Sequence, residues 1–391
     1  MMLDSPLLGP TSPLDARQQE VVTRVSAHER TSILSLPTDD PLDPKRRFRV
    51  EATRSEMFGQ PQAILDTWAR NEAAIDTVSR RFMAGSFDRI FLVGAGDSLA
   101  VMIGARSALE LMTGIPCEPV ESMEFAYYRQ HLVDSRSVVI ALSSSGETTR
   151  TIEAVLVAQH ARAYTVALTN TPESSIDQES ENSLLIEATR VGWPTQSSSA
   201  ALALLLRLGT TIGAHRGAVG AAELARELSE VPELMTRVLA DVDEPIAAIA
   251  AAEAGRSMYL YSAAGPTWAA AIIGAAKVKE TTPDHAVEVQ VEEYHHYNSQ
   301  KPGEPLFLFS PTGPSVARAA YTGRDARRYG GTLYAVTTRG ERAFTEDANQ
   351  VLELPVISEI LSALLYIVPA QLIGYHLGMA KFARAEASKH G

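Results

Sequence analysis

Five hydroxyl side chains crowd into seven residues of the segment "VVIALSSSGETT" (138–149), directly after an apolar, partly β-branched run. The run predicts a buried strand, and the following "TRTIEAVLVAQH" predicts a helix. A helix N-terminus offers unpaired N–H groups and a positive dipole end, and Gly146 lets a ligand approach the backbone. The loop is therefore typical of a cradle for a phosphate or a polyol. Capping is the alternative, because Ser144 and Glu147 are spaced as in a capping box.

A second loop, "VGAGDSLA" (93–100), also lies between a predicted strand and a predicted helix. Ser98 could donate to a ligand and Asp97 could accept from one, although Asp97 would serve equally as a plain N-cap. The glycines lack the spacing of a dinucleotide fingerprint, which argues against a nicotinamide-dependent oxidoreductase. We expect no cofactor.

Acid–base candidates follow in the second half of the chain. Lys277 and Glu280 stand three residues apart in the small, apolar helical pattern "PTWAAAIIGAAKVKE" and therefore share a helix face. A surface salt bridge is one interpretation of this pair. Partial burial is the other, and it would raise the pKa of Glu280 toward that of a useful general base.

The segment "EEYHHY" adds Glu292, Glu293, His295 and His296. Adjacent histidines on a strand point to opposite faces, and no i, i+4 pair completes a ligand shell, so we expect no metal site. A histidine that titrates near neutral pH could instead act as an acid or a base.

These segments belong to an alternation of strands and helices that occurs twice. Each strand of the first half has a counterpart 168 residues later, as Leu92 has in Leu260, and four strand positions share this offset. The strands are expected at 89–96, 137–143, 163–169 and 183–188, and at 257–265, 305–313, 332–338 and 351–355. The pattern predicts an α/β fold with two similar doubly wound, flavodoxin-like parallel sheets in tandem.

The same pattern divides the chain into four parts. Residues 1–56 form an N-terminal arm with one amphipathic helix, and 57–215 form the first domain with a leading helix. A helical connector spans 216–244, and 245–391 form the second domain with a C-terminal helix.

Composition excludes several partners. The net charge of −12 repels phosphate backbones, and no basic stripe is present, so nucleic acid is not an expected partner. A single cysteine, Cys117, allows no intrachain disulfide and fits a cytoplasmic location. The apolar segment 360–380 is nearly long enough to span a membrane, but it contains Pro369, Gln371 and His376. We expect it to be a buried packing helix, with no membrane contact.

Two motifs carry a resemblance to a known family. "GAGDS", followed about 45 residues later by "SSSGETTRTI", resembles the sugar isomerase (SIS) domain. Two such domains in tandem, from about Met57 to about Lys381, are similar to the isomerase half of glucosamine-6-phosphate synthase. They are also similar to stand-alone aminosugar-phosphate deaminases and isomerases and to fructosamine-phosphate deglycases.

The resemblance implies that the loop hydroxyls hold the phosphate of a sugar phosphate. This role maps onto Ser143, Ser145 and Thr148, with Ser144 where many members carry glutamine. A threonine–serine pair of the first loop maps onto Asp97 and Ser98, so the aspartate departs from the family pattern. Another substrate-lining loop maps onto Thr195 in "GWPTQSS".

The resemblance also implies a mechanism. Glu280 would move a proton between C1 and C2 of an open-chain sugar phosphate, and Lys277 would sit near the sugar oxygens. His296, sixteen residues after Glu280, would help open the sugar ring, in the active site of the partner subunit of a homodimer. Glu293 matches an acid that precedes this histidine in the family.

Three departures leave the activity open. "HHYN" replaces the family's "KHGP", and Lys389 near the end lacks the family's Pro-Arg context. The start "MMLD" lacks a cysteine after the initiator methionine, so we expect that glutamine is not the direct nitrogen source. The expected function is that of a sugar-phosphate isomerase or an aminosugar-phosphate deaminase/isomerase. A fructosamine-phosphate deglycase and a non-catalytic sugar-phosphate-binding regulator are the alternatives.

Overall fold

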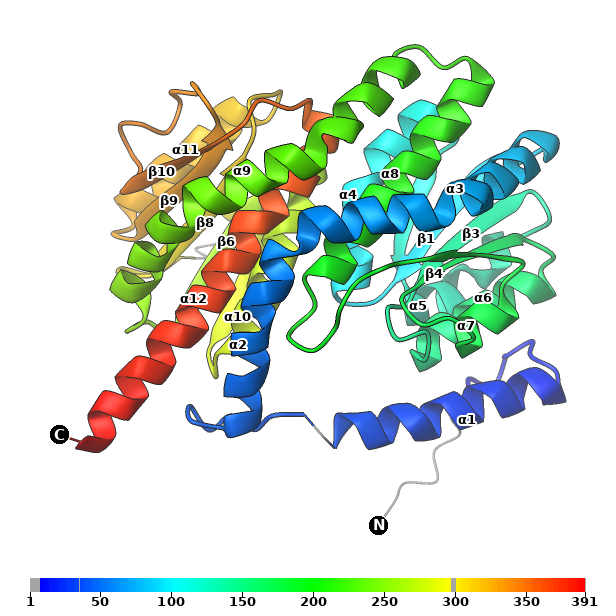
Figure 1. Cartoon of the computed structure of the whole chain (residues 1–391), viewed down its shortest axis with the longest axis horizontal. Coiled ribbons are helices and arrows are strands. Elements are labelled where there is room, and N and C mark those ends of the chain that lie inside the picture. The colour runs from blue at the N-terminus through cyan, green and yellow to red at the C-terminus, as the bar shows by residue number, and fades with distance from the viewer. Residues whose placement is uncertain (1–7, 35, 297–299, 391) are drawn as a thin grey trace.

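The computed structural model describes residues 8–34, 36–296 and 300–390. Within them, two five-stranded parallel sheets lie side by side with helices around and between them (Figure 1). The first sheet has the strand order β2-β1-β3-β4-β5 and the second has the order β10-β9-β8-β6-β7. Taken from its other edge, the second order repeats the first. The predicted α/β fold with two similar doubly wound sheets in tandem is confirmed.

All ladders are parallel, and the central strands are buried along their length. The strands of the first sheet are β1 (Arg89–Gly94), β2 (Cys117–Glu121), β3 (Ser137–Leu142), β4 (Tyr164–Thr169) and β5 (Asn182–Leu185). The strands of the second sheet are β6 (Met258–Ala263), β7 (His285–Gln290), β8 (Pro305–Ser310), β9 (Thr332–Thr338) and β10 (Gln350–Leu354).

Each half contains one edge strand that the sequence analysis did not predict. β2 begins at Cys117 and β7 begins at His285, which is the same offset of 168 residues. Both strands are only partly buried, and Pro119 and several charged residues interrupt their apolar pattern. Such sequences are tolerated at a sheet edge, where one side of the strand needs no ladder partner.

The helices repeat as well, and α9 precedes β6 as α3 precedes β1. The segment expected as a connector, 216–244, begins at the last residue of α8 and the turn after it, and from Ala221 on it is part of α9, which continues through Pro245 to Glu253. The helices are α1 (Ala16–Ile33), α2 (Pro44–Phe58), α3 (Gln60–Ala84), α4 (Asp97–Thr113), α5 (Ser122–Glu124), α6 (Thr149–His160), α7 (Ser175–Glu179), α8 (Gln196–Arg216), α9 (Ala221–Glu253), α10 (Trp268–Thr281), α11 (Val316–Arg328) and α12 (Ala363–His390).

Small residues let three helices meet where the two domains join. A Cβ added to Gly104 of α4 would lie 3.1 Å from the Cβ of Ala269 in α10, so these helices approach closely. A Cβ added to Gly374 of α12 would lie 2.5 Å from the Cβ of Lys277 in α10. The hydroxyl of Thr281 also donates to the carbonyl oxygen of Gly374 at 2.7 Å. α12 therefore seals one face of α10, and this contact buries Lys277.

Two helices, α8 and α12, are long and apolar enough to cross a membrane by length and composition. In each of them 83% of the most apolar window is buried inside the protein, as is usual for a core helix. This agrees with the expectation of a buried packing helix at 360–380.

Cys117 is a free, buried cysteine, and burial raises the pKa of its thiol to about 12.

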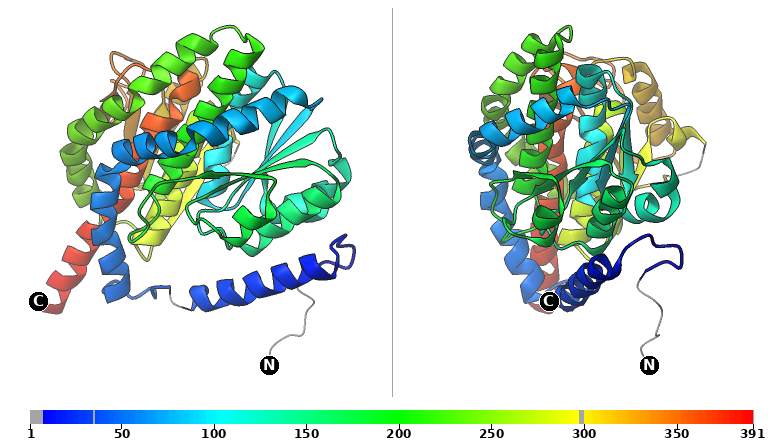
Figure 2. Two further views of the ribbon diagram at one scale, coloured as in Figure 1. Left: turned by 45° about the vertical axis from the view of Figure 1, so that its right-hand side comes forward. Right: turned by 90° about the vertical axis from the view of Figure 1, so that its right-hand side faces the viewer.

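The N-terminal arm consists of two helices with different positions (Figure 2). α1 lies along the outer side of the first domain, where Arg17 pairs with Glu179 at 2.8 Å and Thr149 donates to Glu29. α2 instead packs against α10 and α12 of the second domain.

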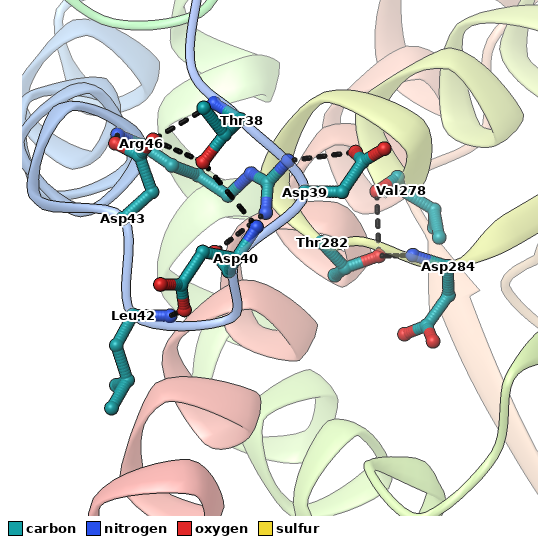
Figure 3. Close-up of polar contacts among 9 residues, drawn as sticks. All are labelled: Thr38, Asp39, Asp40, Leu42, Asp43, Arg46, Val278, Thr282 and Asp284. Carbon is teal, nitrogen blue, oxygen red and sulfur yellow. Dashed lines mark hydrogen bonds and ion pairs between the residues drawn. The ribbon is translucent and has the colours of Figure 1, made fainter.

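The start of α2 is fixed by its own turn (Figure 3). Asp43 caps the helix and also accepts from the backbone N–H and the hydroxyl of Thr38, at 2.8 and 2.7 Å. Arg46, which is buried, donates to the carbonyl oxygen of Asp40 and contacts the carboxylate of Asp39. The second part of the arm is thus a fixed element of the fold that reaches the junction of the two domains.

Candidate active site

A cleft of about 310 Å³ opens at the carboxyl ends of β1 and β3, where the first domain meets α10 of the second. Ligands of doubly wound sheets bind at this end of the strands. The first domain supplies two glycine- and hydroxyl-rich loops and the segment after β5, and α10 supplies Ala276 and Glu280. The lining residues are Ala95, Gly96, Asp97, Ser98, Val101, Leu142, Ser144, Ser145, Thr148, Arg190, Pro194, Ser197, Ser198, Ala276 and Glu280.

The serine loop presents its hydroxyls to this cleft through a tight turn. Gly146 has φ +71°, and a Cβ there would lie 2.0 Å from the hydroxyl oxygen of Ser174, so glycine is required. Ser144, Ser145 and Thr148 line the cleft, whereas Ser143 is buried. The hydroxyls of Ser143 and Thr148 lie 2.9 Å apart and hydrogen bond, so Ser143 orients Thr148 from behind.

The capping interpretation of this loop does not describe the structure. The N-cap of α6 is Thr148, whose own side chain makes no capping hydrogen bond, and the carboxylate of Glu29 in α1 accepts from the backbone N–H of Thr149 at 3.3 Å instead. The hydroxyl of Ser144 donates to Asn170 at 2.8 Å, and the carboxylate of Glu147 accepts from the backbone N–H and the hydroxyl of Ser175, both at 2.8 Å. The capping box is therefore absent, and one N–H group at the N-terminus of α6 is taken by Glu29 of the N-terminal arm.

The first loop places Asp97 and Ser98 at the start of α4. The N-cap is Gly96, whose φ of +56° favours glycine, and Asp97 is the first residue of the helix. Ser98 lines the cleft, and its hydroxyl has no hydrogen-bond partner within the part of the chain that the structure describes. Asp97 is therefore not a cap, and its carboxylate turns to another partner.

That partner is Lys277, which joins both domains in a charged triad. The ammonium nitrogen of Lys277 lies 2.7 Å from Oδ2 of Asp97 and 2.5 Å from Oε2 of Glu280. The Lys277 side chain is 1% exposed, against 16% for Asp97 and 25% for Glu280. The pair of Lys277 and Glu280 is thus not a surface salt bridge, and the ammonium group lies behind the carboxylate that reaches the cleft.

The triad gives Glu280 the pKa of a neutral-pH base. Burial and the nearby charge of Asp97 raise the pKa of Glu280, Lys277 lowers it, and the balance is about 7. The pKa of Lys277 is raised, because the two carboxylates outweigh the effect of its burial. Near pH 7, Glu280 can therefore both accept and release a proton, while Lys277 stays protonated.

Two residues expected in the site lie elsewhere in the single chain. Thr195 is buried at the start of α8, and its neighbours Pro194, Ser197 and Ser198 line the cleft in its place. His296 is 60% exposed, and its Nε2 lies 3.6 Å from a carboxylate oxygen of Glu292, away from the cleft residues.

The neighbouring histidine has a structural role. The ring nitrogens of His295 lie 3.1 Å from the carboxylate of Asp325 and 3.0 Å from the hydroxyl of Thr322, which ties the segment after β7 to α11. Tyr297 and Asn298 of the "HHYN" segment lie outside the described residues.

The sequence analysis missed two arginines of the site. Arg190 lines the cleft beside the serine loop, and Arg49 of α2 is close enough to Glu280 to lower the pKa of that carboxyl. Arg49 also lies 3.6 Å above the ring of Trp193. One signal was available for Arg190, because it follows a predicted strand at the ligand-binding end of the sheet.

The fold and the cleft define a class of protein. Two doubly wound sheets in tandem, with hydroxyl-rich loops at the carboxyl ends of the strands, are typical of α/β proteins with ligand sites at this end. Residues 86–208 match the model of the SIS domain. By this match the first domain contains a SIS domain, as the two motifs implied.

Sequence relatives agree with this assignment. The chain is 30% identical over 329 residues to glutamine–fructose-6-phosphate aminotransferase (isomerizing) from Methanothermobacter thermautotrophicus, covering 83% of the chain and 54% of the relative. The enzyme of the same name from Thermococcus kodakarensis is 27% identical, with the same coverage. The chain thus spans about half the length of the curated relatives it matches.

Solved structures show the same fold. The C-terminal domain of glucosamine–fructose-6-phosphate aminotransferase from Francisella tularensis superposes with a TM-score of 0.75 at 22% identity, covering 83% of the chain and 95% of that domain. Tagatose-6-phosphate ketose/aldose isomerase from Escherichia coli gives a TM-score of 0.70 at 17% identity, with 84% and 92% covered. Glucosamine-6-phosphate deaminase from Thermotoga maritima gives 0.67 at 20% identity, with 84% and 94% covered.

Proposed function

We propose that the chain is an enzyme that transfers a proton between C1 and C2 of an open-chain sugar 6-phosphate, as a sugar-phosphate isomerase or an aminosugar-phosphate deaminase. One observation carries the proposal. A carboxyl group with a pKa of about 7, on Glu280, lines the same cleft as the hydroxyls of Ser144, Ser145 and Thr148. The names of the relatives, which include both kinds of activity, support the same substrate class.

The serine loop would hold the phosphate. Hydroxyls can donate to its oxygens, and the N-terminus of α6 adds the positive end of its dipole, which the carboxylate of Glu29 at Thr149 partly offsets. This contact fixes one end of an extended sugar and directs the other end toward α10. Glu280 would then face C1 and C2.

The proton transfer uses Glu280 in both directions. Its carboxylate takes the proton on the carbon next to the carbonyl, and the released electron pair forms a C1–C2 double bond while the carbonyl oxygen gains a proton. The protonated Glu280 then returns the proton to the former carbonyl carbon, the hydroxyl that was present from the start on the neighbouring carbon loses its proton to become the new carbonyl, and the carbonyl has moved by one carbon. Ser98, at the N-terminus of α4, is placed to donate to an oxygen of this intermediate.

Lys277 would act through Glu280 rather than on the sugar. Its ammonium group is almost fully buried and contacts both carboxylates of the triad. We assign it the role of positioning Glu280 and setting its pKa, with Asp97 holding the ammonium group in place.

For ring opening we propose His296 of a second copy of the chain, since the exposed His296 is free to reach a partner's cleft in a homodimer. A cytoplasmic location stays a prediction.

A deuterium-exchange experiment tests the proposal. A panel of hexose, pentose and aminosugar phosphates is incubated with the protein in D₂O and followed by proton NMR. Deuterium should enter at C1 or C2 of at least one sugar, and Glu280→Gln should reduce the rate by about 10²–10⁴-fold while the sugar still binds. Binding without exchange across the panel would refute the enzyme and favour the regulatory alternative.

A further inference from the structure

Arg190 places a positive charge at the phosphate end of the cleft. It follows β5, lines the cleft together with Ser144, Ser145 and Thr148, and donates from Nη1 to the carbonyl oxygen of Ser144 at 3.0 Å. Its guanidinium group therefore lies against the serine loop itself. The SIS motifs do not include this residue, and hydroxyls alone would suffice for a neutral cradle.

The guanidinium group of Arg190 keeps most of its N–H groups available for a ligand. Within the described part of the chain, Arg190 has no ion pair, and its one hydrogen bond uses one of its five N–H groups. Glu56 is the nearby acid, but its two carboxylate oxygens accept from the backbone N–H groups of Val191 and Gly192, at 2.6 and 3.2 Å. Burial lowers the pKa of Arg190, yet a guanidinium group remains charged in proteins.

α2 fixes the segment that carries Arg190. Three residues on one face of this helix, Arg49, Thr53 and Glu56, bind the backbone of residues 191–193. Arg49 donates to the carbonyl oxygen of Gly192 at 3.1 Å, and Thr53 accepts from the backbone N–H of Trp193 at 2.8 Å. A Cβ on Gly192 would lie 2.5 Å from the hydroxyl oxygen of Thr53, so the two segments are in close contact.

This clamp gives Arg190 a defined position. Glu56 is buried and accepts two backbone N–H groups next to Arg190, while the start of α2 is held by Asp43 (Figure 3). A flexible loop would lose backbone entropy on binding an anion, and the fixed backbone next to Arg190 reduces that cost. The arrangement is therefore suited to binding an anionic group at the serine loop.

We propose that Arg190 binds the phosphate group of the substrate, and that Glu56 is a positioning residue that acts through Arg190. The inference rests on the proposed function, because it takes the serine loop as the phosphate site. It adds that recognition depends on charge as well as on hydroxyls, so the cleft selects dianionic phosphate esters. Charge-assisted hydrogen bonds of this kind are about twice as strong as neutral ones.

Calorimetry with glucitol 6-phosphate tests the inference, because this open-chain sugar phosphate has no carbonyl and cannot be turned over. Arg190→Gln should weaken its binding by about tenfold to a hundredfold, and Arg190→Lys by less, since lysine keeps the charge without the planar fork. Arg328→Gln, which removes an exposed charge in α11, is the matched control and should change the affinity by less than about twofold. Raising the salt concentration should weaken wild-type binding more than that of Arg190→Gln.

The role of Glu56 is tested in the same assay. Glu56→Gln should weaken binding, but the double variant with Arg190→Gln should bind no more weakly than Arg190→Gln alone, because Glu56 acts through the arginine. If Arg190→Gln binds glucitol 6-phosphate as tightly as the wild type does, and the wild type still catalyses deuterium exchange, the role of Arg190 is refuted while the proposed function stands. A wild-type chain that binds neither glucitol 6-phosphate nor inorganic phosphate would overturn it together with the proposed function.

Discussion

In the triad of Asp97, Lys277 and Glu280, the two neighbours of Glu280 shift its pKa in opposite directions. Lys277 lowers the pKa of Glu280 and Asp97 raises it. Removing the cation by Lys277→Met should therefore raise this pKa, and removing the like charge by Asp97→Asn should lower it. Because Glu280 must be ionised to accept a proton, the lower limb of the pH–rate profile should move in opposite directions in the two variants.

The distances set the size of these shifts. Lys277 contacts the Glu280 carboxylate at 2.5 Å, and a contact of opposite charges is worth about 1–3 pKa units, so the midpoint near 7 should rise to about 8–10. Asp97 and Glu280 contact the same ammonium group, so their carboxylates lie within about 5 Å of each other, and Asp97→Asn should lower the midpoint by about one unit. At pH 6 the ionised fraction would rise from about one-tenth to one-half.

The assay is the rate of deuterium exchange into a substrate from the panel, measured from pH 5 to 9. Lys277→Met leaves two buried carboxylates without their cation and can destabilise the fold, so the decisive variant is Asp97→Asn, which keeps the ion pair of Lys277 and Glu280. A rise of the midpoint in Asp97→Asn, or equal shifts in both variants, would refute the electrostatic account of the triad.

Three further predictions follow from the same structure. Glu280→Gln should stabilise the protein above pH 7 but not below pH 4.5. The pKa of Glu280 is about 7 in the folded state and 4.5 in the unfolded state, so the unfolding free energy of the wild type falls by about 3 kcal/mol as the pH rises between these values. Urea unfolding of both proteins at pH 4 and pH 8 measures the difference. Gly374→Ala should lower the unfolding free energy by about 1–3 kcal/mol, because the added Cβ would clash with Lys277. Gly255→Ala is the control and should be tolerated, because the atom nearest to its added Cβ lies 3.5 Å away. Equal losses of stability in the two variants would contradict the packing argument. If His296 serves the partner's cleft, mixing equal amounts of Glu280→Gln and His296→Ala chains should restore about one quarter of the wild-type exchange rate, because about half of the dimers are mixed and each mixed dimer has one intact site. No recovery of exchange although mixed dimers form would place His296 outside the shared site.

The sequence predicted those parts of the fold in which apolar residues follow a regular pattern. The central strands are long, β-branched and buried on both faces, so their apolar runs and their common offset of 168 residues were visible directly. The edge strands β2 and β7 were not visible. They bury only one side, and Pro119 or charged residues occupy the other.

The candidate site was predictable only where it coincides with a local motif. Two parts of the site, the serine loop and the pair of Lys277 and Glu280, each lie within a few residues of one helix end. Their spacing in the sequence was therefore enough to identify them as candidate site residues. The contact between Lys277 and Asp97 joins residues 180 positions apart and depends on the closeness of α4, α10 and α12. No periodicity encodes such a contact.

The part played by the N-terminal arm is the largest difference between expectation and structure. The arm was expected to contain one amphipathic helix, yet a second helix, α2, begins at Pro44, and its residues bind the backbone of the cleft wall. A signal did exist, since Arg49, Thr53 and Glu56 recur at the spacing of one helix face. Their partners are backbone groups of residues 191–193, which carry no sequence signature.

The repeat also explains why one domain holds the hydroxyls and the other holds the base. In the second domain, the loops after β6 and β8 contain Gly265 and Gly313, and both face the carboxylate of Glu359. A Cβ on Gly313 would lie 2.6 Å from Oε2 of this residue, and burial raises its pKa. A carboxylate of the chain thus lies beside the position that corresponds to the phosphate loop, where a phosphate would meet like charge. The second domain is therefore poorly suited to hold a second phosphate, and its contribution to the shared cleft is α10, which carries Lys277 and Glu280 to the first domain.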